Sequence, residues 1–274
     1  IQSVYRSLHP EIIFINYQKN VYKLNMKDFS MVQITNFMNQ KAATKPEVKS
    51  TFLEKQQTEL FDYIKDEKQQ IEWEKQDEKR FKEVIPKEIF YDKSVLEQVQ
   101  PSPNGNFVTF RLSNYPVPNN TNVEQFITDN GATQHQKARP KVGISNFSTH
   151  KFGIYNVQKD TCYFVSYSKL TGKNKQPIYF EDYTKKDSVY DAKVVMQNPI
   201  FNDEGTIAIQ EIRSQDNKHR WIVQLDLAVG TITELEHQED PAWIGGPGIP
   251  SYSFSKGTLG FIDANSIYFQ SEIT

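Results

Sequence analysis

The side chains best suited to acid–base or metal chemistry in this chain are five histidines, which stand far apart in the sequence: His9, His135, His150, His219 and His237. None follows another by four residues, so the chain lacks the helical His-Glu-x-x-His motif that holds catalytic zinc. His237 and Glu239 have the ligand-and-base spacing of a zinc deaminase, but that reaction needs a pair of cysteines and the chain has a single one. We therefore interpret His237 as a surface residue.

That single cysteine, Cys162, limits the chemistry further. One thiol excludes an internal disulfide and a zinc site built from several thiolates. Apolar residues, Met31 and Ile232, hold the equivalent positions of a segment that is repeated along the chain. The sequence therefore predicts a buried structural thiol rather than a nucleophile.

Motifs of nucleophilic and phosphate chemistry are also absent from the sequence. No Gly-x-Ser-x-Gly occurs, so nothing places a serine on the strained strand-to-helix turn of a hydrolase. The glycine-rich residues 245–248 lack the Lys-Ser/Thr of a phosphate loop and predict a tight turn. Neighbouring carboxylates, at 181–182 and 239–240, cannot face each other across a substrate as a general acid and base must. The sequence thus predicts no catalytic, cofactor-binding or metal-ligating residue, and no cofactor.

The composition is typical of a folded soluble chain and argues against two classes of partner. Of the 274 residues, 37% are hydrophobic and 24% are charged. The net charge of −2 provides no basic surface for phosphates, so we expect no nucleic acid partner. No run approaches the roughly 18–20 apolar residues of a membrane span. The chain begins with Ile1 and has no signal-peptide pattern, which indicates a trimmed chain and leaves its compartment undetermined.

Three segments of the chain share one sequence pattern, and this internal repeat predicts the fold. Residues 24–34, 155–165 and 225–235 align without gaps. In each segment an apolar residue is followed by Asn or Asp and then by another apolar residue. A short polar turn and a second strand come next. A repeated hairpin buries its apolar face only against neighbouring repeats, which is typical of stacked or radial β architectures. Corners rich in Pro, Asn and Gly, at residues 101–106 and 198–205, precede two further strands.

Two segments depart from the repeated β pattern. Residues 47–85 contain neither Gly nor Pro, and Lys, Glu, Gln and Asp dominate them. A thin apolar stripe at helical spacing predicts a long charged α-helical insertion at about 45–87. This helix either packs on the rim of the β structure or forms a partner-binding or dimer arm. The long polar connection at 113–141 is expected to be functional or to lie on the rim.

The corner at residues 101–108, together with the Asn/Asp hairpin, resembles the blades of the propeller domain in the prolyl oligopeptidase family, with Asn104 where that family has Asp. Residues 240–248 and 267–272 are similar to segments of its dipeptidyl-peptidase-IV-like branch. The resemblance implies a mainly β fold in which residues 1–274 form one incomplete β-propeller domain that carries the helical insertion. In that family the propeller covers an α/β-hydrolase domain, which supplies the catalytic serine, aspartate and histidine and would follow this chain.

The resemblance implies a non-catalytic function: this propeller domain would gate substrate access in a dipeptidyl-peptidase-IV-like serine exopeptidase. Its partners would be its own C-terminal α/β-hydrolase domain, a peptide substrate and, through open sheet edges, further copies in a homo-oligomer. A periplasmic or secreted location follows from the resemblance alone. The branch holds its substrate's amino terminus with adjacent glutamates, and the absence of a Glu-Glu pair here puts strict dipeptidyl peptidase specificity in doubt. The alternative function is a stand-alone propeller scaffold that docks partners through its helical arm.

Overall fold

The computed structural model describes residues 1–39, 85–117, 120–140, 147–177, 190–244, 261–263 and 266–268. These residues form strands and turns and no helix, which confirms the mainly β class. The predicted helical insertion at 45–87 lies outside the described residues, apart from the irregular residues 85–87. No helix that could cross a membrane occurs within the described ranges.

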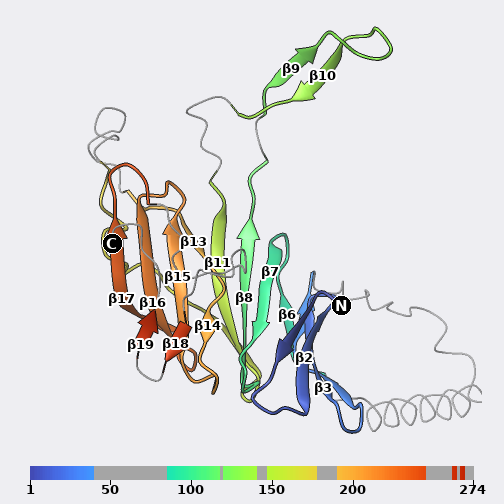
Figure 1. Ribbon diagram of the computed structural model, residues 1–274, viewed down its shortest axis with the longest axis vertical. Coiled ribbons are helices and arrows are strands. Elements are labelled where there is room, and N and C mark those ends of the chain that lie inside the picture. The colour runs from blue at the N-terminus through green and yellow to red at the C-terminus, as the bar shows by residue number, and fades with distance from the viewer. Residues whose placement is uncertain are drawn as a thin grey trace, which may run out of the picture.

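Three antiparallel sheets, each with a path of four strands, follow one another along the chain (Figure 1). The first sheet has the order β1 (Ser3–Arg6), β2 (Ile12–Tyr17), β3 (Asn20–Asn25) and β4 (Met31–Gln33). The second has the order β7 (Val95–Pro101), β8 (Phe107–Asn114), β11 (Thr149–Asn156) and β12 (Thr161–Phe164). The third has the order β13 (Val194–Met196), β15 (Ala208–Ser214), β16 (His219–Asp226) and β17 (Thr231–Glu239), and β14 (Ile200–Phe201) also pairs with β15.

Three short strand pairs complete the described structure. They are the parallel pair β5 (Asn36–Met38) with β6 (Glu88–Phe90), and the antiparallel pairs β9 (Asn122–Gln125) with β10 (Gln134–Lys137) and β18 (Phe261–Asp263) with β19 (Ser266–Tyr268). The β9–β10 hairpin projects away from the sheets (Figure 1). The polar connection at 113–141 therefore contains an exposed hairpin arm rather than loop alone.

The repeated sequence pattern forms the same hairpin in every sheet, from the third strand to the fourth. Each turn is closed by the repeated Asn or Asp, whose side chain accepts a backbone N–H of the turn at 2.9–3.0 Å: Asn25, Asn156 and Asp226. The same turn position has a positive φ each time, between 47° and 79°: Phe29, Asp160 and Gly230. The predicted internal repeat is thereby confirmed as a structural one.

The corners between β1 and β2, between β7 and β8, and between β14 and β15 lie in contact from one sheet to the next. The peptide N–H of Leu8 donates to the carbonyl of Pro103 at 2.8 Å, which joins the first sheet to the second. The Asn104 side-chain amide donates to the carbonyl of Gly205 at 2.8 Å, which joins the second to the third. Gly205 has φ +66°, and a Cβ there would lie 2.9 Å from the backbone nitrogen of Asn104, so the close approach requires glycine. These contacts hold the corner ends of the three sheets next to one another.

The second sheet is buried on both faces because it packs between the other two. One apolar cluster joins it to the first sheet and includes Phe14, Val21, Val108, Phe110 and Tyr155. The other joins it to the third sheet and includes Phe152, Ile154, Met196, Trp221 and Val223. Side chains along β11 alternate between the two clusters, as the period of a β-strand requires. This face-to-face packing of successive sheets is that of neighbouring propeller blades.

The row of sheets continues beyond the third. Ile209 and Ile222 on its far face pack together, with Ile267 of β19 against them. Among the described residues the sheets do not close into a ring. The described fold is therefore mainly β, with successive sheets packed face to face, and the incomplete propeller stays a prediction.

The prediction of a buried cysteine is wrong, because Cys162 is exposed. It lies on β12, which is an edge strand of the second sheet and, of the strands that the structure describes, pairs with β11 alone. Met31, at the equivalent position of the first sheet, is exposed as well. Ile232, at the equivalent position of the third sheet, is half-buried against the apolar cluster, so this repeat position does not by itself predict burial.

Candidate functional site

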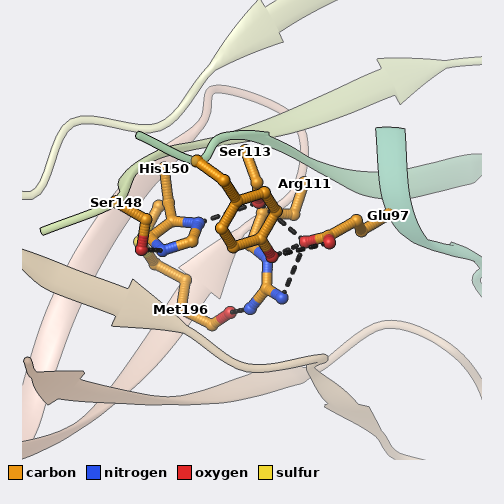
Figure 2. Close-up of polar contacts among 7 residues, drawn as sticks. Glu97, Arg111, Ser113, Ser148, His150 and Met196 are labelled. Carbon is orange, nitrogen blue, oxygen red and sulfur yellow. Dashed lines mark hydrogen bonds and ion pairs between the residues drawn. The ribbon is translucent and has the colours of Figure 1, made fainter. Parts of the chain in front are cut away.

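A cluster of polar side chains lies at one end of the second sheet (Figure 2). Strand register places its members on one face: Glu97 of β7 is paired with Arg111 of β8, and Ser113 of β8 is paired with His150 of β11. Tyr115 follows β8 and contributes its hydroxyl. The cluster combines a serine, a histidine and a carboxylate, the three groups of many hydrolytic sites, so the direction of each hydrogen bond decides its chemistry.

The Glu97 carboxylate is the acceptor at the centre of this cluster. Its Oε2 accepts from Arg111 Nη2 at 2.9 Å, Arg111 Nε at 3.2 Å and Ser113 Oγ at 2.7 Å. Its Oε1 accepts from the Tyr115 hydroxyl at 2.7 Å. Burial alone would raise the pKa of Glu97, but the hydrogen bonds from Tyr115, Ser113 and Arg111 outweigh it and lower the pKa. The carboxylate is thus ionised, saturated with donors and a weak base.

His150 is the second titratable group of the cluster. Its Nδ1 lies 2.8 Å from Ser113 Oγ, and its Nε2 lies 2.9 Å from Ser148 Oγ. Burial, with the nearby charge of Arg111, lowers the pKa of His150, so the imidazole is neutral at neutral pH. Because Ser113 gives its one proton to Glu97, its oxygen accepts from His150 Nδ1–H, and His150 Nε2 then accepts from Ser148.

This proton order separates the cluster from a serine-hydrolase triad in two ways. The hydroxyl of Ser113 is directed to the carboxylate and not to a histidine base. Ser148 does face His150, but its own peptide N–H donates to Gln215 Oε1 at 3.2 Å and cannot stabilise an oxyanion. Among the residues that the structure describes, this cluster therefore has no activated nucleophile with a free oxyanion donor beside it.

The cluster does connect structural elements. Arg111 Nη1 donates to the carbonyl of Met196 in β13 at 2.7 Å, and so links the second sheet to the third. Gln215, after β15, bonds both backbone groups of Ser148 at the start of β11. Tyr115 attaches the base of the β9–β10 arm to Glu97. The geometry suits a clamp that positions two sheets and an arm, and we assign it that role.

The remaining residues considered from sequence occupy separate places. His135 lies on β10, exposed, and His9 follows the corner of the first sheet. His219 and His237 come together with Glu239, the one group of three potential metal ligands found among the described residues. Asp240 instead caps a turn, where its carboxylate accepts the peptide N–H of Trp243 at 2.9 Å. The glycine-rich residues 245–248 and the carboxylates at 181–182 lie outside the described residues.

Both side-chain groups were missed from sequence because their members meet across strands. Glu97 and Arg111 are joined through a bulge in β7, and the strands β8 and β11 are separated by a long connection. In the third sheet the repeated hairpin fixes the pairing of Asp226 with Thr231, but the register shift at Ile222/Val223 defeats counting back along the strands to His219 and His237.

Comparison with known proteins finds no matching protein-family model and no matching curated protein. Solved structures that are similar to this chain include two bacterial proteins. Dipeptidyl peptidase 4 of Porphyromonas gingivalis is 13% identical, with a TM-score of 0.42, over 88% of this chain and 26% of that one. A Bacteroides ovatus protein described as a dipeptidyl aminopeptidase IV is 10% identical, with a TM-score of 0.36, over 85% of this chain and 29% of that one. The chain thus spans less than a third of the length of either protein.

Proposed function

We propose that this chain is the first part of the propeller of a dipeptidyl-peptidase-IV-like serine exopeptidase. The observation that carries the proposal is the succession of three four-stranded sheets with matched corners and matched outer hairpins, followed by the pair β18–β19. These corners and hairpins are the segments in which the sequence resembles the propeller of the prolyl oligopeptidase family, and residues 240–248 and 267–272 resemble its dipeptidyl-peptidase-IV-like branch. In this proposal the next domain along the gene product is an α/β-hydrolase.

The role of the chain in such an enzyme is selection of substrates rather than bond cleavage. The sequence has no nucleophile elbow, and the Ser113–His150–Glu97 group has the wrong proton order for a nucleophile. A propeller above a hydrolase domain restricts access to peptides that are short or unfolded. The saturated Glu97 carboxylate leaves little capacity for a substrate amine, so peptide binding falls to groups on the inner strands or beyond this chain.

The reading frame that follows Thr274 tests this proposal at the level of the gene. We expect it to continue through further blade-like repeats into a Gly-x-Ser-x-Gly elbow, followed by an aspartate and then a histidine. A natural stop codon shortly after Thr274 would rule the peptidase out.

The second candidate function is a stand-alone interaction scaffold, and one observation favours it. The β9–β10 arm carries apolar side chains in solvent: Phe126 is 70% exposed and Ile127 is 91% exposed. The helical arm that the sequence suggests for docking lies outside the described residues. A Phe126→Ser/Ile127→Ser variant should lose self-association or partner capture under the scaffold function, yet leave peptide hydrolysis by the complete gene product unchanged under the peptidase function.

A further inference from the structure

Two histidines and a glutamate converge at one end of the outer hairpin of the third sheet. His219 of β16 lies directly opposite Glu239 of β17, and Trp221 lies opposite His237. Alternation along each strand therefore places all four side chains on one face. A register shift at Ile222/Val223 makes this possible. A regular continuation of the hairpin would have turned His237 and Glu239 to the opposite face.

The ligand atoms of this group are close enough to share one ion. His219 Nδ1 lies 3.1 Å from His237 Nε2. One ligand atom from each of the three residues lies within 4.8 Å of the other two. Two nitrogens bound to a tetrahedral zinc at roughly 2.0–2.1 Å lie about 3.3 Å apart, which is near the observed separation. The long and largely exposed side chain of Glu239 can close the remaining distance by rotation.

The two imidazoles are held in position by their surroundings. The rings of His219, Trp221 and His237 are near parallel, with interplanar angles of 9–18°. The Trp221 indole N–H donates to the carbonyl of Thr171 at 2.8 Å, which ties the rings to the loop above them. Gly172 in this loop has φ +74°, and a Cβ there would lie 3.1 Å from His237 Cε1 and 3.3 Å from His219 Cε1. Such preorganisation favours ligation, because little side-chain freedom remains to be lost.

Access also suits a cation. His219 is 3% exposed, and Lys175 Nζ lies 2.9 Å from Glu239 Oε1, so a cationic group already occupies this carboxylate. A cavity of about 380 Å³ reaches His219 and Glu239 from solvent, and a second, of about 630 Å³, reaches His237 and Glu239.

We propose that His219, His237 and Glu239 form a binding site for a divalent transition-metal ion of the zinc, nickel or copper class. Two imidazoles and one carboxylate are a ligand set that such ions accept, and it leaves a coordination position for water. The ion takes the place of the proton between the two imidazoles and displaces Lys175 from Glu239. It fastens the end of β17 to β16 beneath the loop at 168–175.

The direct test is titration of the 274-residue chain with zinc by isothermal titration calorimetry. We expect one equivalent to bind, and magnesium and calcium, which prefer oxygen ligands, to give no comparable heat. His237→Gln should weaken zinc binding by at least about 10-fold. The matched control is His135→Gln, an exposed histidine on β10, which should bind zinc as the unaltered chain does. Absence of stoichiometric zinc binding, or equal losses in both variants, would overturn the proposal.

A gain of affinity provides a second test, which does not depend on removing a buried side chain. Lys175→Gln frees the Glu239 carboxylate and should tighten zinc binding by roughly 2- to 5-fold, the size of an exposed ion pair. Lys27→Gln, which breaks an exposed pair with Glu11 on the first sheet, is its control and should change nothing. Unchanged or weaker binding in Lys175→Gln would count against Glu239 as a ligand.

Cobalt identifies the ligand type. Cobalt(II) bound by the three residues should show visible d–d absorption without the near-ultraviolet charge-transfer band of a thiolate. The exposed thiol of Cys162 is the competing ligand. A thiolate band that disappears in Cys162→Ser would place the ion there and contradict the proposed site. Far-UV circular dichroism of each variant establishes that the fold is retained.

Discussion

Glu97→Gln tests in most detail whether the cluster of Figure 2 is a structural clamp. The substitution keeps the size of the side chain and removes its charge, so the two bonds from Arg111 lose the attraction between opposite charges. The Arg111 guanidinium remains in a place where its side chain is only 10% exposed. Removing one charge of a buried ion pair costs about 3–5 kcal/mol. Because the Glu97 side chain is 24% exposed and the amide oxygen still accepts hydrogen bonds, we expect a smaller destabilisation of about 2–3 kcal/mol.

The assay is urea unfolding followed by tryptophan fluorescence, with the midpoint and slope fitted together. Glu124→Gln, at an exposed position on β9, is the control and should stay within about 0.5 kcal/mol of the unaltered chain. Glu97→Gln combined with Arg111→Met should be less destabilised than the sum of the two changes, because no unpaired charge remains. A Glu97→Gln chain as stable as the original, with the same slope, would refute the clamp.

Three further predictions concern the same framework. The pKa values of His150 and Glu97 are both lowered in the folded protein. Each group therefore contributes its full stability above its pKa in the unfolded chain, and this contribution is lost as the pH falls. The loss begins below about pH 6.5 for His150 and below about pH 4.3 for Glu97. The urea midpoint should therefore fall from pH 7 to 5, and less steeply in His150→Gln; equal slopes would exclude His150 as a source. Gly153→Ala should destabilise the chain by about 1–3 kcal/mol in urea unfolding, because the new methyl group would overlap the Phe110 ring, and unchanged stability would contradict that packing. Asn104→Asp should cost about 1–2 kcal/mol by thermal unfolding, because a carboxylate cannot donate to the Gly205 carbonyl, and a neutral result would show that this bond does not join the corners.

The elements predicted best from sequence are those whose contacts are local. The outer hairpin was recognisable because Asn25, Asn156 and Asp226 close their own turns within a few residues. The corner at Gly105 was recognisable for the same reason, because its positive φ is a requirement of the turn itself. Turns of this kind depend on residues that are neighbours in the sequence, so the sequence predicts them directly.

The parts that escaped prediction depend on register between distant strands. The pairing of Ser113 with His150 spans the whole β9–β10 arm, and no local pattern specifies it. The meeting of His219 and His237 depends on one register shift in β17 that places both rings on the same face. Cys162 was assigned to the core because its repeat position is apolar, although that position lies on an edge strand. Sequence periodicity predicts which strands pair locally, and it does not specify which faces then meet.

The measurement that bears most directly on the proposed function is hydrolysis and serine labelling by the complete gene product, side by side with this chain. We predict that the complete protein cleaves chromogenic Ala-Pro or Gly-Pro dipeptides and reacts with a fluorophosphonate at a serine beyond Thr274, and that residues 1–274 alone do neither. Labelling of this chain alone, for example at Ser148, or a complete gene product inert in both assays, would contradict the proposal.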